Sequence, residues 1–362
     1  MKKIRRSKCL ESINSLYVDL GDNGYIAKPC CVFLDDGKTP QVETIQELLT
    51  NSYTKEIRDR FRKNWRRPEC ASCEMNENMG KDSRRLRSLK WGYDGKIRRW
   101  DLRPGNTCNL KCAMCNFSNS SKWIEDLDIL EKYTGRKNKP KTFKREDIDW
   151  EWIYSQVVDT AHYIYIAGGE PFYMKNVHKF LEDLSTHEWN CKHTRIQIQT
   201  NGVSNTPKFL EILSKFKRLE FSISIDGWDK VNEIIRFPTN HNTWIENVNQ
   251  LKQLDTEDLY FNITVQAMNL PDIDNLVYNI KDRWNGRYDI HKLYGPKQLS
   301  LNNLKPSVVE KVIETTSVPE LHGFCEDYKY NEELNKKMQN YLLELDTRRG
   351  TDSKTVIPWC YA

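Results

Sequence analysis

The sequence lacks any long apolar run. None of its segments approaches the ~18 consecutive apolar residues of a membrane-spanning helix. The basic start, residues 1–12, carries no apolar stretch of the kind found in a secretory signal peptide. Low-complexity tracts are missing too, as are internal repeats of fixed period beyond the strand–helix alternation described below. We therefore expect a cytoplasmic protein with no membrane partner.

The composition is that of a globular protein with a well-hydrated surface. Of the 362 residues, 38% are hydrophobic and 30% are charged, which suits one large domain and a smaller one. The net charge of +5 is modest. The charge is therefore no sign of nucleic-acid binding by itself. The 11 tryptophans and 17 tyrosines suit core packing or a substrate groove.

Cysteine is abundant and its number is odd. There are 11 cysteines, and several stand close together in the sequence. Without an export signal they are expected in a reducing compartment, where metal or redox use is commoner than disulfide formation.

The most informative group is Cys108, Cys112 and Cys115. Three thiols on a short loop can turn toward one point. Thiolates are soft ligands that suit iron–sulfur clusters, zinc and copper(I). Three protein ligands leave one position open for chemistry, whereas a structural site would close it with a fourth residue. A zinc loop completed by a distant ligand is the alternative at this point.

From residue 96 onward, strand-like and helix-like patterns alternate. Six such units predict an α/β fold, a partial (β/α)6 TIM-like barrel with right-handed crossovers. The strand-like runs are 97–103, 163–167, 195–200, 219–225, 260–266 and 288–294. The helical patterns are 121–133, 147–158, 176–184, 207–216, 243–254 and 272–284.

Four consecutive predicted strands end in cysteine, glycine or polar residues. The cysteine trio follows the first, residues 168–171 the second, 201–202 the third and 226–227 the fourth. Barrel enzymes carry their chemistry at the C-terminal ends of the strands. Four such strand ends in a row, one of them followed by the cysteine trio, therefore predict an active site at that edge of the sheet.

We expect four segments: a cysteine-rich α+β domain at 1–80, a linker at 81–95, the barrel at 96–295 and a helical C-terminal extension at 296–362. In the first domain, strand signals at 16–20 and 25–27 flank a turn, and helical patterns lie at 44–49 and 55–65. Its cysteines suit a closed metal site, for which zinc and a second iron–sulfur cluster fit equally well. The expected ligands are Cys9, Cys30, Cys70 and Cys73, with Cys31 as the substitute for Cys30.

At these residues the sequence resembles the radical S-adenosylmethionine (SAM) enzymes over roughly 95–295. The motifs are the Cys-x3-Cys-x2-Cys trio, Gly168-Gly-Glu-Pro171, Thr200-Asn-Gly202 and the strand end at 222–227. The resemblance implies a [4Fe–4S] cluster whose open iron is chelated by the amino and carboxylate groups of SAM. It also implies reductive cleavage of SAM to a 5′-deoxyadenosyl radical, which abstracts hydrogen from a substrate.

The resemblance assigns roles to individual residues. Cys108, Cys112 and Cys115 would hold three irons, Glu170 would accept hydrogen bonds from the SAM ammonium, and Gly168 and Gly169 would allow close approach. Further expected cofactor contacts are Met114 and Gln266 at the adenine, Ser224 and Asp226 at the ribose, Arg236 at the SAM carboxylate, and Pro171 and Asn201 within their motifs. For Gln266 the alternative is plain barrel core, and for Arg236 it is surface ion pairing.

The N-terminal segment resembles the SPASM/twitch auxiliary-cluster domain through Cys9, the approach at 24–30 and the Cys70-x2-Cys73 pair. This implies an auxiliary [4Fe–4S] cluster, although in many relatives that domain follows the barrel. Cys191, Cys325 and Cys360 are expected to be buried inert thiols. Cys360 alone, near the chain end, could reach the active site or a cluster.

Auxiliary-cluster relatives often modify peptides, so the expected substrate is a peptide or protein side chain, with an electron donor such as flavodoxin or ferredoxin. A nucleotide, sugar or RNA base is an alternative, supported by the arginine-rich segments 58–67 and 84–99. A second alternative is a non-catalytic binding module stabilised by zinc or a cluster.

Overall fold

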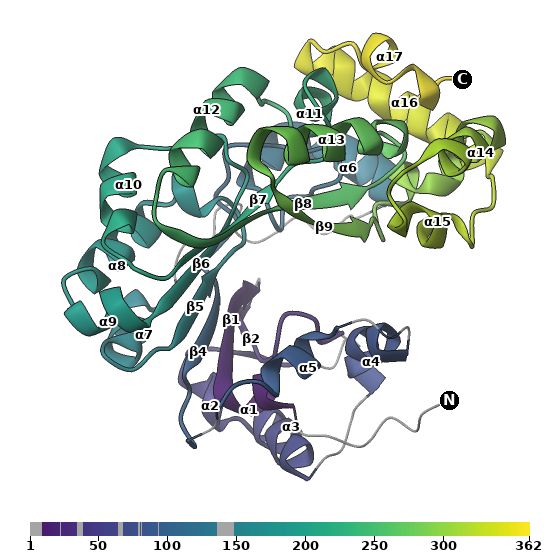
Figure 1. Ribbon diagram of the computed structural model, residues 1–362. Coiled ribbons are helices and arrows are strands. Elements are labelled where there is room, and N and C mark those ends of the chain that lie inside the picture. The colour runs from purple at the N-terminus through teal and green to yellow at the C-terminus, as the bar shows by residue number, and fades with distance from the viewer. Residues whose placement is uncertain are drawn as a thin grey trace.

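The computed structural model describes residues 9–21, 23–34, 39–63, 68–78, 80, 82–92, 94–135 and 148–362. Within them, nine strands form one curved sheet in the order β3-β2-β1-β4-β5-β6-β7-β8-β9 (Figure 1). The strands are β1 (Ser15–Gly21), β2 (Gly24–Ile26), β3 (Gln41–Val42), β4 (Arg99–Arg103), β5 (Tyr163–Ile166), β6 (Arg195–Thr200), β7 (Leu219–Ser224), β8 (Thr256–Val265) and β9 (Arg287–Lys292).

Strands β4 to β9 run parallel in sequence order, with helices between them. This confirms the predicted α/β fold with a partial barrel. Helices such as α8, α10 and α12 cover the outer side of the sheet (Figure 1). The helices of this part are α6 (Leu127–Thr134), α7 (Trp150–Val157), α8 (Lys175–Leu184), α9 (Glu188–His193), α10 (Pro207–Ser214), α11 (Lys230–Ile235), α12 (His241–Lys252) and α13 (Ile273–Trp284).

Alternating side chains explain how the sheet is covered. In β5, Ile164 and Ile166 are fully buried toward the helices, whereas Tyr163 and Tyr165 lie on the inner face and are partly exposed. Helix α10 begins at Pro207, after Thr206 accepts a hydrogen bond from the amide of Phe209. The outer face is thus closed by apolar packing, and the inner face remains polar.

The N-terminal segment does not stand apart from the barrel sheet. Strand β1 pairs in parallel with β4, from Ser15 opposite Arg99 to Asp19 opposite Arg103, and so adds a seventh parallel strand. The predicted return strand is β2, which pairs antiparallel with β1. The segment 81–95, expected to be a linker, contains a helix. The N-terminal helices are α1 (Leu10–Asn14), α2 (Glu47–Thr50), α3 (Ser52–Arg62), α4 (Ala71–Asn78) and α5 (Arg84–Ser88).

The C-terminal extension is helical and packs at the other end of the curved sheet, near β8 and β9 (Figure 1). Its helices are α14 (Pro306–Thr315), α15 (Glu320–Cys325), α16 (Glu332–Arg349) and α17 (Ser353–Val356). Short 3-10 turns lie at Pro68–Cys70, Ser121–Asp126, Pro171–Tyr173, Leu270–Asp272, Lys297–Leu299, Leu301–Asn303 and Pro358–Cys360. No helix in the described parts of the chain combines the length and apolar character needed to cross a membrane.

Candidate active site

The cysteine trio lies on the loop that follows β4, and backbone hydrogen bonds hold this loop in place. The amide of Lys111 donates to the Phe237 carbonyl and the amide of Ala113 to the Ile235 carbonyl, each at 2.7 Å. The indole of Trp123 donates to the Cys112 carbonyl at 3.2 Å. From the C-terminal extension, the Tyr341 hydroxyl donates to the Ala113 carbonyl at 2.7 Å. The loop is therefore fixed from three sides.

The three thiols lie near enough to one another for their charges to interact. Burial raises the pKa of Cys108, and the charges of Cys112 and Cys115 raise it further. Burial, and then the charge of Cys112, raise the pKa of Cys115 to about 12. The Cys108 sulfur also accepts hydrogen bonds from the Leu110 amide at 3.4 Å and the Asn201 side-chain amide at 3.9 Å. Donors aimed at a sulfur suit a thiolate ligand.

The Gly-Gly-Glu turn after β5 packs directly against this loop. The Glu170 amide donates to the Thr107 carbonyl at 2.8 Å. Gly169 has φ +54°, and a Cβ there would clash with the Thr107 carbonyl oxygen and the Met174 side chain. Only glycine allows this approach without strain. Gly168, with φ +90°, also adopts a conformation that L side chains rarely take.

The carboxylate of Glu170 is fully inside the protein and is held by donors from two neighbouring segments. It accepts hydrogen bonds from the Thr200 hydroxyl at 2.7 Å, the Asn201 amide at 2.6 Å and the Phe172 amide at 3.0 Å. Asn201 in turn donates to the Asn109 side chain at 2.8 Å. The ends of β4, β5 and β6 thus meet at the cysteine loop, as the sequence predicts.

A comparison with protein families gives a match over the part of the chain that holds this arrangement. Residues 102–277 match the model described as the Radical SAM superfamily. The matched residues make up just under half of the chain. Enzymes carry this domain, so the chain is an enzyme, and the superfamily implies a [4Fe–4S] cluster and SAM. The comparison with curated proteins gave no match.

Several solved structures are distantly similar to the chain. A tagged form of anSMEcpe with bound AdoMet is 19% identical with a TM-score of 0.42, and the match covers 59% of this chain and 57% of that one. Streptococcus suis SuiB bound to precursor peptide SuiA is 14% identical with a TM-score of 0.37, covering 96% and 71%. TYW1 with a lysine-pyruvate adduct bound is 11% identical with a TM-score of 0.31, covering 64% and 72%. Similarities at this level assign no substrate.

At the end of β7, the radical SAM domain contains a buried ion pair. Arg236 Nε lies 2.7 Å from Asp226 Oδ2, and Asp226 has no exposed surface. Asp226 Oδ1 accepts a hydrogen bond from the Thr264 amide at 2.7 Å. Burial raises the pKa of Asp226, and the Arg236 charge opposes this shift. The two residues expected to contact the SAM ribose and carboxylate are thus already paired with each other, next to the buried Ser224.

Arg236 also lies close to the trio. Burial raises the pKa of Cys112, while the positive charge of Arg236 lowers it. The same charge acts on Cys115. The pair therefore links the end of β7 electrostatically to the cysteine loop, and a ligand carboxylate at this point would have to share Arg236 with Asp226.

The two residues expected at the adenine lie in different surroundings. Gln266, directly after β8, is fully buried, and within the described part of the chain neither its side-chain nitrogen nor its side-chain oxygen has a hydrogen-bond partner. Such an unsatisfied amide is unusual in a protein interior and suits a site that is completed by a ligand. Met114 is partly buried and lines a cavity with Cys115 and Lys297, between the cysteine loop and the C-terminal extension. Pro171 begins the short turn that follows Glu170.

Four of the five N-terminal cysteines line one cavity. Phe33 and Phe61 complete its apolar wall, and the cysteines are Cys9, Cys30, Cys70 and Cys73. Burial raises the pKa of Cys9 to about 11, and the charge of Cys73 adds to the shift. Cys31 is not among the residues that line this cavity. Its sulfur accepts a hydrogen bond from Arg84 Nη1 at 3.1 Å.

Cys360 is fully buried, and its thiol donates to the Ala267 carbonyl at 3.5 Å. The thiol is therefore satisfied by a backbone carbonyl of the barrel, just after β8. Tyr341 and Trp123, which hold the cysteine loop, were not identified from the sequence. In the sequence, both have the pattern of ordinary aromatic residues on a helix face. No local pattern distinguishes an aromatic side chain that contacts a distant loop from one that packs in a core.

Proposed function

We propose that the chain is a radical SAM enzyme that cleaves SAM reductively and abstracts hydrogen from a peptide or protein side chain. The observation that carries this proposal is the contact between two loops. The Glu170 amide bonds to the residue that precedes Cys108, and Asn201 bonds both to the Glu170 carboxylate and to the Cys108 sulfur. A cluster-binding loop and a ligand-binding carboxylate share one small volume.

The residues present fit the groups that the superfamily implies. Cys108, Cys112 and Cys115 would each hold one iron of a [4Fe–4S] cluster and leave the fourth iron to SAM. Glu170 would accept the SAM amino group, and the unsatisfied amide of Gln266 would meet the adenine. When bound, the cluster and SAM supply one-electron cleavage of a sulfonium and a hydrogen-abstracting radical.

The chain's own residues orient the ligands and exclude water. Glu170 is held by three donors, so its carboxylate cannot turn away. Trp123 and Tyr341 are almost completely buried and close the outer side of the cysteine loop. Asn201 fixes the position of Cys108 relative to Glu170. This rigidity supports a site in which reactive chemistry is shielded from solvent.

The inner face of the sheet supports a polar substrate such as a peptide. Arg103 pairs with Asp101 at 2.9 Å, and Tyr165 donates to Gln199 at 2.5 Å. These side chains can offer both donors and acceptors to peptide groups. Two of the arginines that suggest nucleic acid are engaged in ion pairs instead: Arg84 pairs with Glu11 at 2.8 Å, and Arg85 pairs with Glu77. An electron donor such as flavodoxin or ferredoxin completes the proposal.

Deuterium transfer tests this function. The reconstituted, dithionite-reduced chain is incubated with SAM and a perdeuterated peptide digest, and 5′-deoxyadenosine is analysed by mass spectrometry. We expect 5′-deoxyadenosine that carries deuterium from the peptides and none from a perdeuterated RNA digest. Deuterium from the RNA digest alone would contradict the peptide assignment, and a lack of 5′-deoxyadenosine would contradict the whole proposal.

SAM binding should depend on pH through Glu170. Burial raises the pKa of Glu170 to about 7, against the hydrogen bonds from Asn201 and Thr200. Only the carboxylate attracts a bound amino group, so affinity should rise as pH increases through 7. Glu170→Gln removes this titration. We expect the ratio of the Kd of the variant to that of the wild type to grow about ten-fold from pH 6 to pH 8.

Equilibrium binding of radiolabelled SAM at several pH values measures this ratio, in which the titration of SAM itself cancels. Glu182→Gln is the matched control, because Glu182 on α8 is exposed and pairs with Lys208 at 3.0 Å. The control should show a ratio that does not change with pH. A constant ratio for Glu170→Gln would show that Glu170 does not act through its charge.

We further propose that Cys9, Cys30, Cys70 and Cys73 hold an auxiliary [4Fe–4S] cluster. Their convergence on one apolar cavity supports this, and four protein ligands would close the site. Cys30→Ala should lower the iron content by about four atoms per chain. Cys31→Ala should leave it unchanged, because Cys31 bonds to Arg84 outside the cavity.

Iron and sulfide analysis after anaerobic reconstitution distinguishes these two neighbouring cysteines. The two variants are matched in chemistry and differ by one position in the chain. Loss of iron in Cys31→Ala with full iron in Cys30→Ala would contradict the ligand set.

A further inference from the structure

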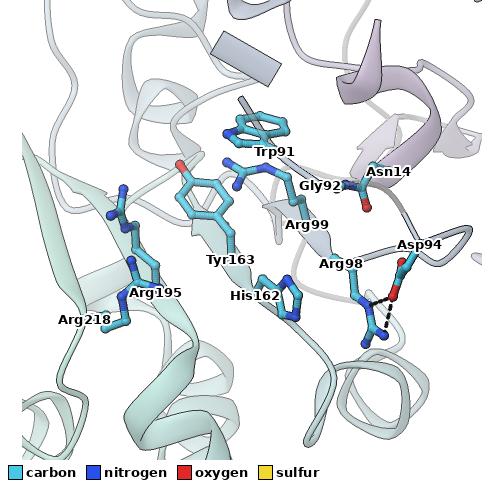
Figure 2. Close-up of a pocket in the computed structure, with 10 residues that line it drawn as sticks. All are labelled: Asn14, Trp91, Gly92, Asp94, Arg98, Arg99, His162, Tyr163, Arg195 and Arg218. Carbon is cyan, nitrogen blue, oxygen red and sulfur yellow. Dashed lines mark hydrogen bonds and ion pairs between the residues drawn. The ribbon is translucent and has the colours of Figure 1, made fainter. Parts of the chain in front are cut away.

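A cavity of about 480 Å³ lies at the edge of the sheet opposite the cysteine loop. It opens at the N-terminal ends of β4, β5 and β6, where Arg99, Tyr163 and Arg195 stand in register on adjacent strands (Figure 2). Arg99 and Arg103 mark the two ends of β4, so about 13 Å of strand separates this cavity from the cysteine loop. Its volume is within the range of small-molecule sites.

Positive charge dominates this cavity. Four arginines line it: Arg98, Arg99, Arg195 and Arg218. Arg98 pairs with Asp94 at 2.6 Å, the ion pair drawn in Figure 2. The charge of Arg98 is therefore balanced locally, and the excess positive charge comes from the other three arginines.

Arg195 and Arg218 share one close carboxylate. Each lies 2.6 Å from Glu257, on opposite oxygens of that carboxylate. Glu220 is farther from Arg195, at 3.7 Å. Even with both glutamates and Asp94 included, positive charge remains in excess around the cavity.

Arg99 has no carboxylate partner among the described residues. Its guanidinium lies between two aromatic rings, 3.2 Å from the centroid of Trp91 and 3.9 Å from that of Tyr163 (Figure 2). Its Nε is buried and has no hydrogen-bond partner in the part of the chain that the structure describes. Burial lowers the pKa of Arg99 to about 10, so it is still protonated at neutral pH. A partly buried cation without a counter-ion is costly, and a bound anion would offset that cost.

We propose that this cavity binds a phosphate group, free or carried by a small molecule, through Arg99 with Arg195 beside it. The two rings hold the guanidinium of Arg99 in one plane, and a planar fork of fixed orientation suits the bidentate binding of an oxyanion. Arg195 and Arg218 lie beyond Tyr163 and supply further positive charge (Figure 2). The site is separate from the proposed active site and does not depend on it.

Isothermal titration of the reconstituted full chain with inorganic phosphate at constant ionic strength tests the proposal. We expect a Kd below about 1 mM. Arg99→Gln should weaken binding at least about ten-fold, because a charge-assisted contact is lost. Arg287→Gln is the matched control: Arg287 also lies over an aromatic ring, Tyr260, at 4.2 Å, but it pairs with Asp258. This control should bind phosphate as the wild type does.

Further arms separate the possible outcomes. Adenosine 5′-monophosphate distinguishes an esterified phosphate from a free one, and acetate tests whether any carboxylate suffices. Arg195→Gln, which leaves Arg99 in its sandwich, keeps the test valid if Arg99→Gln fails to fold by circular dichroism, and it should also weaken binding. Cys112→Ala should bind phosphate normally, which separates this site from the proposed catalysis. The proposal would be overturned if folded Arg99→Gln or Arg195→Gln bound phosphate as tightly as the wild type. Acetate binding as tight as phosphate binding would overturn it too.

Discussion

Cys112→Ala is expected to reduce the formation of 5′-deoxyadenosine from SAM to background. Cys112 is one of the three thiols on the loop that follows β4, and its charge acts on both Cys108 and Cys115. Two thiolates cannot hold three irons, so the cluster with the open position should not assemble. Iron content should fall by about four atoms per chain. Anaerobic assays of SAM cleavage and iron content measure both effects.

Cys191→Ala is the control for this experiment. Cys191 is a partly buried thiol on α9 that donates to the Ser185 carbonyl at 3.3 Å, remote from both cysteine groups. It should retain full iron content and full SAM cleavage. If Cys112→Ala also retained full cleavage, the assignment of the trio would be wrong.

Asp226→Asn is expected to lower the free energy of unfolding by about 3–5 kcal/mol. The substitution leaves Arg236 buried without its counter-charge, and removing one member of a buried ion pair is strongly destabilising. The asparagine can still accept the hydrogen bond from the Thr264 amide, so the loss reports on the charge. Anaerobic denaturant titration followed by circular dichroism measures the change.

Asp258→Asn provides the comparison on the surface of the same sheet. Asp258 pairs with Arg287 at 2.5 Å, and both side chains are well exposed. Exposed pairs contribute about 0–1 kcal/mol, so this variant should be nearly as stable as the wild type. If both variants lost the same free energy of unfolding, burial would not explain the contribution of the Asp226–Arg236 pair to stability.

Much of the barrel follows from local patterns. The sequence predicts a strand at 195–200, where β6 lies, and one at 219–225, where β7 ends one residue earlier. Apolar and polar residues alternate along both strands, because one face packs against helices and the other faces the polar inner side of the sheet, and this alternation is a local signal. The convergence of the three strand ends at the cysteine loop could also be predicted, because parallel strands place their C-terminal ends at one edge.

Other features depend on contacts that no local pattern records. Strand β8 begins at Thr256, four residues before the predicted start. The prediction misses this first part because Glu257 and Asp258 interrupt the apolar pattern. Both carboxylates pair with arginines of other strands. The parallel pairing of β1 with β4 joins segments about eighty residues apart, and such long-range pairing has no signature in either strand.

The choice between Cys30 and Cys31 illustrates the same limit within the site. The two cysteines are adjacent and chemically identical, so spacing cannot separate them. The structure turns Cys30 into the apolar cavity and Cys31 toward Arg84, which also pairs with Asp101 at 2.9 Å. The pairing of Asp226 with Arg236 is a second example, since the nine residues between them carry no sign that the two side chains meet.

Chemical analysis of the anaerobically reconstituted chain tests the central claim most directly. Iron, sulfide and zinc are quantified, and the same sample is reduced in the presence of SAM. We expect about eight irons and eight sulfides per chain, and 5′-deoxyadenosine that forms only when reductant is present. A colourless, zinc-loaded protein that leaves SAM intact under reduction would contradict the account.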